Sequence, residues 1–247
     1  MTLPVLDQPT YEMTLPSTNK KIRYRPFLVK EEKILLMAQE GDDVGEQIEA
    51  VKQIIRNCII STGVRVEDLS TFDIEYLFIQ IRSKSVGKDI ELQYRKDECK
   101  EVLEEDNNPP PRTCQLAFVV DLDKVYIDKT EGHTNKIELT DQVGVFMKYP
   151  DFRLLHKITT LNDYDEMIKV IGRCIETIYM DEQIFDPKEY TEEEMQTFLE
   201  SFSQEQFQKI SDFFDSMPQT AYDANIVCRK CGWKTDMKLK GISDFFV

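Results

Sequence analysis

Two cysteines near the C-terminus, Cys228 and Cys231, have the spacing of metal ligands and are followed directly by Gly232. Two thiolates three positions apart can reach one tetrahedral zinc ion at about 2.3 Å. A glycine after the second ligand relieves the tight turn that the two ligands require. Alternating residues typical of a strand follow, from Trp233 to Leu239. The pattern is that of a zinc knuckle.

One knuckle supplies only two ligands, so a closed structural site needs two more from elsewhere in the chain. The candidates are Cys99 and Cys114, which flank a loop containing two asparagines and three prolines at 107–111. If the segments on either side of this loop form a hairpin, the mouth of the hairpin can bring both sulfurs to the knuckle. The zinc hypothesis is therefore one structural zinc held by Cys99, Cys114, Cys228 and Cys231.

Two other interpretations of the same cysteines stay open. They can be free structural thiols, or Cys228 and Cys231 can form a redox pair. A redox Cys-x-x-Cys usually follows a strand and opens a helix, whose N-terminus lowers the pKa of the thiol. Here a strand pattern follows the second cysteine. The sequence context therefore disfavours thiol oxidoreductase chemistry without choosing between zinc and free thiols.

The rest of the sequence offers little material for catalysis. It has no Gly-x-Ser-x-Gly elbow, no glycine-rich dinucleotide motif and no His-Glu-x-x-His pair. The only two histidines, His133 and His156, are beside lysines or loop residues, and we interpret both as surface residues. With 46 acidic residues, neighbouring carboxylates are expected by chance. We therefore expect a protein that is not an enzyme.

Charge and composition limit the partners and the location. The formal net charge of −15 repels phosphate backbones, so we expect no nucleic-acid partner. The first 20 residues contain no apolar signal region, and there is no apolar run of about 18 residues, so we expect no membrane partner. Six scattered cysteines fit a reducing compartment. These features favour a soluble cytoplasmic protein.

Local patterns predict mainly helices in the first third of the chain. Two alternating segments around a turn predict a hairpin over 9–29, and a helix is expected to begin at Lys30. Apolar residues at helical spacing over 48–59 predict a second helix, with Cys58 on its core face. Ser70 can cap a third helix that is apolar nearly all round, so we expect that helix to be covered on most sides.

The C-terminal part again favours helices. A stripe of apolar residues over 167–178 predicts one helix with Cys174 on its core face. Two capping boxes, which begin at Thr191 and Ser203, predict two more helices.

Between these helical parts, alternating segments predict strands over 88–150. The fold class is therefore α+β: helical halves flanking a small antiparallel sheet, with a C-terminal Cys-x-x-Cys knuckle-like β element. The boundaries that we expect are 1–87 for the hairpin and helices, 88–150 for the inserted β region and 151–247 for the C-terminal helices and cysteine element. The three regions can also pack as one domain.

Long and specific blocks run through most of the sequence: 9–18, 24–33, 72–78, 82–87, 143–150, 228–232 and 241–246. Beginning with the opening of the chain, these blocks resemble the baseplate hub proteins of T4-like tailed bacteriophages. The resemblance implies a hub subunit or hub assembly chaperone that is made in the host cytoplasm and builds the central baseplate hub of a contractile tail. The implied partners are other phage baseplate hub proteins, and the implied location is the host cytoplasm during assembly or the tail baseplate of the virion.

Two alternatives from other classes are kept. A zinc-ribbon adaptor that binds nucleic acid or transcription machinery would need a basic face around the knuckle, for which Lys234, Lys238 and Lys240 are local candidates, with Arg229 and Lys230. A thiol oxidoreductase would use Cys228 and Cys231, and would need a depressed thiol pKa.

Overall fold

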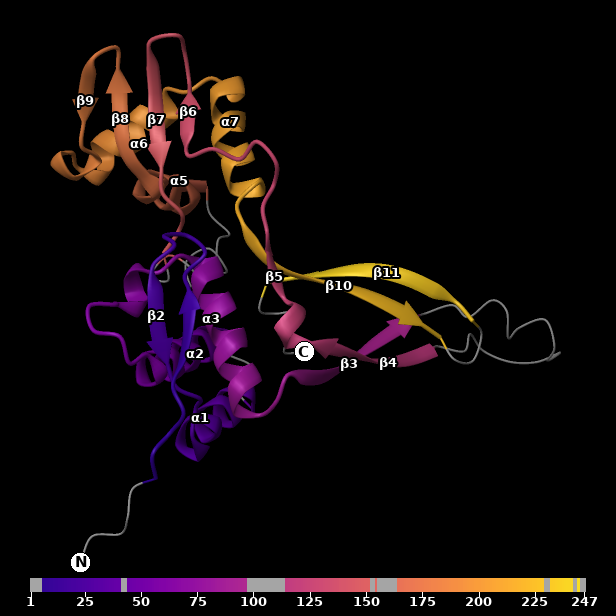
Figure 1. The fold of residues 1–247 in the computed structure, drawn as a ribbon. Helices are drawn as coiled ribbons and strands as arrows, with labels where there is room; N and C mark the ends of the chain where they lie inside the picture. Colours follow the sequence, from indigo (N-terminus) through magenta and orange to yellow (C-terminus); the bar gives the residue numbers. More distant parts are fainter. Residues whose placement is uncertain are drawn as a thin grey trace, which may run out of the picture.

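The computed structural model describes residues 6–40, 44–96, 114–151, 154, 164–228, 232–241 and 244. The described chain has three parts, which Figure 1 shows side by side. We call them the N-terminal lobe, the C-terminal lobe and the arm. The arm is a pair of β-ribbons that projects away from both lobes. Strands from the middle and from the end of the sequence build it together.

The N-terminal lobe consists of a hairpin packed on helices. Its elements are β1 (Tyr11–Thr14), β2 (Lys21–Tyr24), α1 (Val29–Glu40), α2 (Val44–Cys58), the short 3-10 helix η1 (Val66–Asp68) and α3 (Thr71–Ser85). The hairpin is antiparallel, with Tyr11 opposite Tyr24, so the expected hairpin is confirmed. The core joins Leu15 and Ile22 of the hairpin region to Ile54 and Ile55 of α2. Burial of these apolar side chains is the main stabilisation of the lobe.

Helix α3 is covered on most sides, as its sequence predicts, because it serves two cores. Leu77 and Ile81 pack in the N-terminal lobe. Ile79 packs with Val120 and Leu239 of the arm. The helix begins at the expected cap, where the Ser70 hydroxyl accepts from the Asp73 N–H at 3.3 Å. This helix therefore joins the arm to the N-terminal lobe.

A fully buried carboxylate fixes the start of α1. Glu31 is inaccessible to solvent and accepts a hydrogen bond from Arg25 at 3.2 Å and one from the Leu28 N–H at 2.8 Å. Burial by itself raises the pKa of the Glu31 carboxyl. The hydrogen bonds from Arg25 and Leu28 and the nearby positive charges outweigh burial, so the pKa lies below its ordinary value.

We expect Glu31→Gln to lower the free energy of unfolding by about 3 kcal/mol, because it leaves the Arg25 charge without its buried partner. Since the folded-state pKa of Glu31 is depressed, its contribution is present above the unfolded pKa and is lost as pH falls through the folded pKa. The difference between wild type and variant should therefore shrink in acid. Urea unfolding over a pH series measures it, with exposed Glu32→Gln as the matched control, expected to stay within about 0.5 kcal/mol of wild type. An equal effect of both variants would contradict this account.

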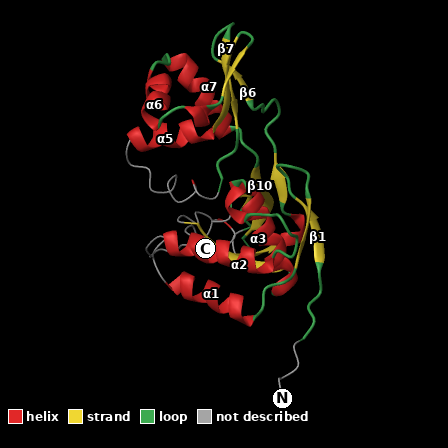
Figure 2. Cartoon of the chain, turned by 90° about the vertical axis from the view of Figure 1, so that its left-hand side faces the viewer, coloured by secondary structure: helices red, strands yellow, loops and turns green. Residues whose placement is uncertain are grey.

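The C-terminal lobe is a four-stranded antiparallel sheet with helices on one face (Figures 1 and 2). The strands are β6 (Lys136–Glu138), β7 (Val143–Met147), β8 (Ile175–Met180) and β9 (Gln183–Phe185), in that spatial order. The helices are α5 (Tyr164–Cys174), α6 (Glu192–Glu200) and α7 (Gln204–Asp215), and the 3-10 helix η4 (Pro187–Glu189) precedes α6. Both capping boxes, at Thr191 and Ser203, are confirmed.

One helix is shorter than the sequence predicts. The apolar stripe over 167–178 is divided, because α5 ends at Cys174 and β8 begins at Ile175. Ile175 and Ile178 therefore point into the core from a strand and not from a helix. The segment after Cys174 is rich in β-branched and aromatic residues, which favour a pleated strand once a neighbouring strand is present. The prediction of a single helix over 167–178 was wrong.

Gly144 in β7 makes room for a neighbouring tyrosine. A Cβ added at Gly144 would overlap the Tyr179 phenol and would lie 2.6 Å from the Ile137 carbonyl oxygen. We therefore expect Gly144→Ala to destabilise the protein by about 2 kcal/mol, because either the ring or the backbone must move. The control is Gly172→Ala in helix α5, where the new Cβ makes an ordinary contact, 3.5 Å from Leu199 of α6. Stability should rise by about 1 kcal/mol, because alanine favours a helix more than glycine does. Thermal or urea unfolding tests both; a tolerated Gly144→Ala would refute the steric argument.

The expected α+β class with antiparallel sheets is confirmed, with one difference in arrangement. The strands of region 88–150 do not form one sheet. They are distributed over three sheets, two of which are completed by strands from later in the chain. One of these pairings joins residues about 90 positions apart, such as Thr220 with Ile127, and local sequence patterns carry no information on such partners.

Candidate functional site: the arm and its tip

The arm is made of two antiparallel ribbons. The first is β3 (Asp89–Lys96) with β4 (Cys114–Asp121), joined through the 3-10 helix η3 (Leu122–Lys124) to β5 (Tyr126–Asp128). The second is β10 (Gln219–Val227) with β11 (Lys234–Lys240), and β5 pairs with the base of β10. Alternation in both ribbons places one row of apolar side chains between them. The expected hairpin around the Cys99 to Cys114 region is therefore present as β3 and β4.

The distal half of the arm has its own small core. Leu116, Ala224, Ile226 and Cys228 are buried there. Aromatic residues and a methionine from both ribbons close over them: Tyr94, Phe118, Tyr222, Trp233 and Met237. This cluster is separate from the cores of both lobes, so the arm can hold its shape at a distance from the body.

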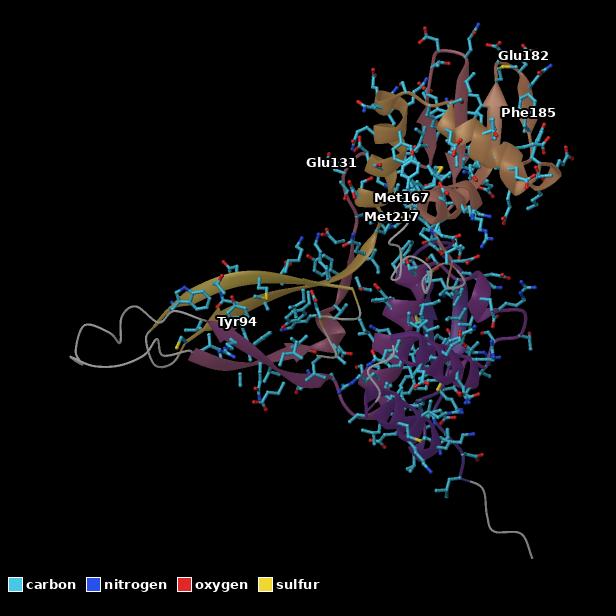
Figure 3. The ribbon with its side chains drawn as sticks, turned by 180° about the vertical axis from the view of Figure 1, so that it is seen from behind. Tyr94, Glu131, Met167, Glu182, Phe185 and Met217 are labelled. Atoms are coloured by element: carbon cyan, nitrogen blue, oxygen red, sulfur yellow. The ribbon has the colours of Figure 1, made fainter. Side chains whose placement is uncertain are left out.

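Stacked rings connect the two ribbons near the tip. The rings of Tyr94 and Trp233 are nearly parallel, with centroids 6.1 Å apart. Tyr94 belongs to β3 and lies between the ribbons, well away from the lobes (Figure 3). Trp233 lies between the Cys-x-x-Cys sequence and β11. The end of the first ribbon and the turn of the second are therefore in contact.

The turn at Cys228 has the features that its sequence predicts. The Cys228 N–H donates to the Trp233 carbonyl at 2.7 Å, and the Gly232 N–H donates to the Cys228 carbonyl at 2.9 Å. Gly232 has a φ of 70°, in the left-handed region where glycine meets no steric penalty. The positive φ of Gly232 agrees with the expected need for a glycine at this position, and residues 229–231 lie outside the described residues.

The four predicted zinc ligands are described to different extents. Cys228 is buried at the end of β10. Cys114 begins β4 opposite Lys96, so its backbone stands at the mouth of the first hairpin. Cys99 and Cys231 lie outside the described residues. Within the described ranges no group of three or more histidine, cysteine or carboxylate side chains is placed to hold a metal. The knuckle is not shown, and the zinc site stays a prediction whose described members lie at one end of the arm.

The remaining described cysteines have structural positions. Cys58 and Cys174 are buried in the cores of the two lobes, as expected from their helical stripes. Burial raises the pKa of the Cys58 thiol to about 11 and that of Cys174 to about 12. Thiols of this kind are protonated at neutral pH and react slowly with disulfides.

The surface of β11 is mixed in charge. Lys234, Lys238 and Lys240 are exposed, as is Asp236. Lys238 forms an ion pair with Asp128 at 3.0 Å. Arg229 and Lys230 lie outside the described residues. The described part of this face therefore lacks the uniform positive charge on which the nucleic-acid adaptor hypothesis depends.

The sequence alone did not predict a cluster of aromatic rings that connects the two lobes. His133, expected on the surface, is partly buried and stacks on Phe213 with centroids 5.1 Å apart. Its ring nitrogens lie 2.9 Å from the Ser216 hydroxyl and 3.1 Å from the Tyr149 hydroxyl. Tyr149 in turn meets Phe72 of α3 edge to face. Burial lowers the pKa of His133, so it is neutral at pH 7. His156 lies outside the described residues.

The C-terminal lobe has an open pocket of about 640 Å³ between α5, α6 and η4. Its rim carries ion pairs, including Arg173 with Glu192 at 2.8 Å and Lys169 with Glu166 at 3.0 Å. The described lining contains no histidine, cysteine or serine. The described lining therefore holds no Ser-His or Cys-His pair. None of the described helices is long and apolar enough to cross a membrane.

Two lobes and a projecting arm define the described chain as an α+β protein. No curated protein and no solved structure matches the chain significantly. A family model, that of the T4 bacteriophage base plate proteins, matches residues 8–247. The chain belongs to this family, which confirms the resemblance to T4-like baseplate proteins and indicates a structural role in the phage baseplate.

Proposed function

We propose that this chain is a non-enzymatic subunit or assembly chaperone of the baseplate hub in a contractile-tailed phage. The observation that carries the proposal is the family match over 8–247, which includes both lobes and the arm. The arm supports it, because it projects from both lobes and offers an extended surface to other proteins. Its partners are other baseplate hub proteins, and it acts in the host cytoplasm during tail assembly.

A structural zinc at the tip of the arm is part of this proposal. The ligands would be Cys99, Cys114, Cys228 and Cys231. Support comes from the β3–β4 hairpin, which places Cys114 at its mouth, and from the contact of Tyr94 with Trp233, which holds that mouth to the Cys228 turn. Four thiolates leave no open coordination position, so such a zinc would stabilise the arm and would not take part in a reaction.

The content of finished tails distinguishes a hub subunit from a chaperone. We propose tagging the chain in the phage genome and measuring it by mass spectrometry in purified tails and in assembly intermediates. Presence in both identifies a retained subunit, and presence in intermediates alone identifies an assembly chaperone. Absence from both would refute the proposed function.

A further inference from the structure

The sheet of the C-terminal lobe has one face that none of the described helices covers. Ile137, Val145, Ile178 and Phe185 point toward α5, α6 and α7. Their neighbours along each strand point to the opposite face, as alternation requires. Gly144, Tyr179 and Ile184 are consecutive cross-strand partners on that outer face.

The outer face carries an apolar platform of Phe146, Tyr179 and Ile184. The Tyr179 ring lies across Gly144, where a Cβ would overlap it, and its centroid is 5.7 Å from that of Phe146. The ammonium of Lys136 lies 5.4 Å from the same ring centroid. Ile184 is 76% exposed and Phe146 is 39% exposed. A large exposed isoleucine beside a flat aromatic ring loses stabilisation unless another surface covers it.

The platform adjoins an open sheet edge. β9 is the last strand in the order β6-β7-β8-β9 and pairs only with β8 within that sheet. Met180 and Gln183 close the two-residue turn of the β8–β9 hairpin, and Tyr179 and Ile184 form the next pair. Hydrogen-bonded and non-hydrogen-bonded pairs alternate along an antiparallel ladder, and the pair that closes a two-residue turn is hydrogen-bonded. The N–H and C=O of Ile184 therefore point away from β8, toward the open edge.

The charges around this edge are strongly acidic. Residues 176–189 contain one lysine, Lys188, and five exposed carboxylates: Glu176, Asp181, Glu182, Asp186 and Glu189. Glu182 and Phe185 lie at the outer hairpin of the lobe, far from the arm (Figure 3). Such a surrounding repels a second copy of the same edge and attracts lysine or arginine. Charge complementarity therefore favours a basic partner segment.

We propose that the β9 edge and the platform of Phe146, Tyr179 and Ile184 bind an extended segment of another protein, which adds to the sheet as a fifth strand. Main-chain hydrogen bonds to Ile184 would supply affinity, as in other cases of strand addition. The segment would carry an apolar side chain for the platform, flanked by lysine or arginine. The inference rests on the proposed function in one respect, namely that this segment belongs to another baseplate protein.

The test uses purified full-length chain and baseplate precursors isolated from cells infected with a phage that lacks the chain. Binding is measured by co-sedimentation over a concentration series at low and high salt. Ile184→Pro removes the outward N–H, and Ile184→Arg adds a charge that repels a basic partner. Ile184→Val keeps the N–H and the apolar surface. Met37→Arg makes the same apolar-to-charged change at an exposed residue of α1 in the N-terminal lobe.

We expect Ile184→Pro and Ile184→Arg to weaken binding by about tenfold or more, because the proline leaves a carbonyl of the added strand buried without its donor and the arginine repels a basic segment. Ile184→Val and Met37→Arg should bind like wild type, and high salt should weaken wild-type binding. An exposed edge position tolerates Ile184→Arg, so an unchanged unfolding midpoint shows that this variant is folded.

Three results would overturn the inference: equal binding by Ile184→Arg and wild type, wild-type binding that is insensitive to salt, or a photo-crosslinker at position 184 that reacts only with a second copy of this chain. Failure of the proposed function is a different result, because the wild-type chain would then not bind the precursors at all. If Ile184→Pro and Ile184→Arg both bind as strongly as wild type, the proposed function stays intact and only the β9 site is refuted.

Discussion

A phage that lacks this chain is expected to produce no complete, infectious tails while the host shows no metabolic defect. The reason is that the chain belongs to a family of phage baseplate proteins. If the chain is a hub component, as proposed, every assembly step that needs its contacts is blocked without it. The effect should therefore be nearly complete rather than graded.

Plaque counts and electron microscopy of lysates measure this effect. Expression of the wild-type chain from a plasmid should restore tails, which shows that the defect belongs to this protein. A phage that lacks the chain and still forms complete, infectious tails would contradict a role in assembly.

The second large effect concerns the tip of the arm. Cys228→Ser is expected to remove zinc from the protein and to destabilise the arm, because a three-thiolate site holds the metal less tightly than a closed tetrahedral one. Structural zinc contributes on the order of 10 kcal/mol in small zinc domains, so the loss should be far larger than that of an ordinary thiol substitution. Elemental analysis of untagged protein should give about one zinc per chain for wild type.

The matched control is Cys58→Ala, at a buried thiol in the N-terminal lobe. It should cost about 1 kcal/mol in stability through lost packing and keep the zinc. Cys114→Ser should behave like Cys228→Ser. If wild-type protein is fully stable without metal, the zinc site does not exist and the four cysteines are ordinary thiols.

Local signals in this sequence predicted local structure well. Ser70, Thr191 and Ser203 cap the helices that their patterns predict, because capping depends on residues within one turn of each other. The β1–β2 and β3–β4 hairpins were likewise predicted from alternation on both sides of a turn. These elements follow from short-range hydrogen bonding and side-chain periodicity, which a single sequence displays directly.

Longer-range features could not be predicted in the same way. The pairing of β5 with β10 joins distant parts of the chain, and nothing in either strand specifies the other. The helix predicted over 167–178 is too long. The apolar spacing fits a helix over the whole range, and only the pairing of β8 with β7 shows that the chain becomes a strand after Cys174. His133 was assigned to the surface because a histidine in a turn is usually exposed, and only the packing of α7 against that turn shows otherwise.

The two candidate sites also differ in how far the sequence alone predicts them. The spacing of Cys228 and Cys231 and the hairpin near Cys114 could be read from the sequence, and the structure places the described members at one end of the arm. The β9 platform could not be predicted. It depends on Gly144 and Tyr179 being cross-strand partners, which is a property of register and not of either residue.

The measurement that tests the central claim most directly is the sedimentation of a tagged chain from infected cells during tail assembly. If the chain is a baseplate hub subunit or chaperone, the tag will appear in fractions that contain baseplate precursors, together with other baseplate proteins. It will be missing from those fractions when the phage carries a block in an earlier hub protein. A tag that stays at the position of the free monomer throughout infection would contradict the account.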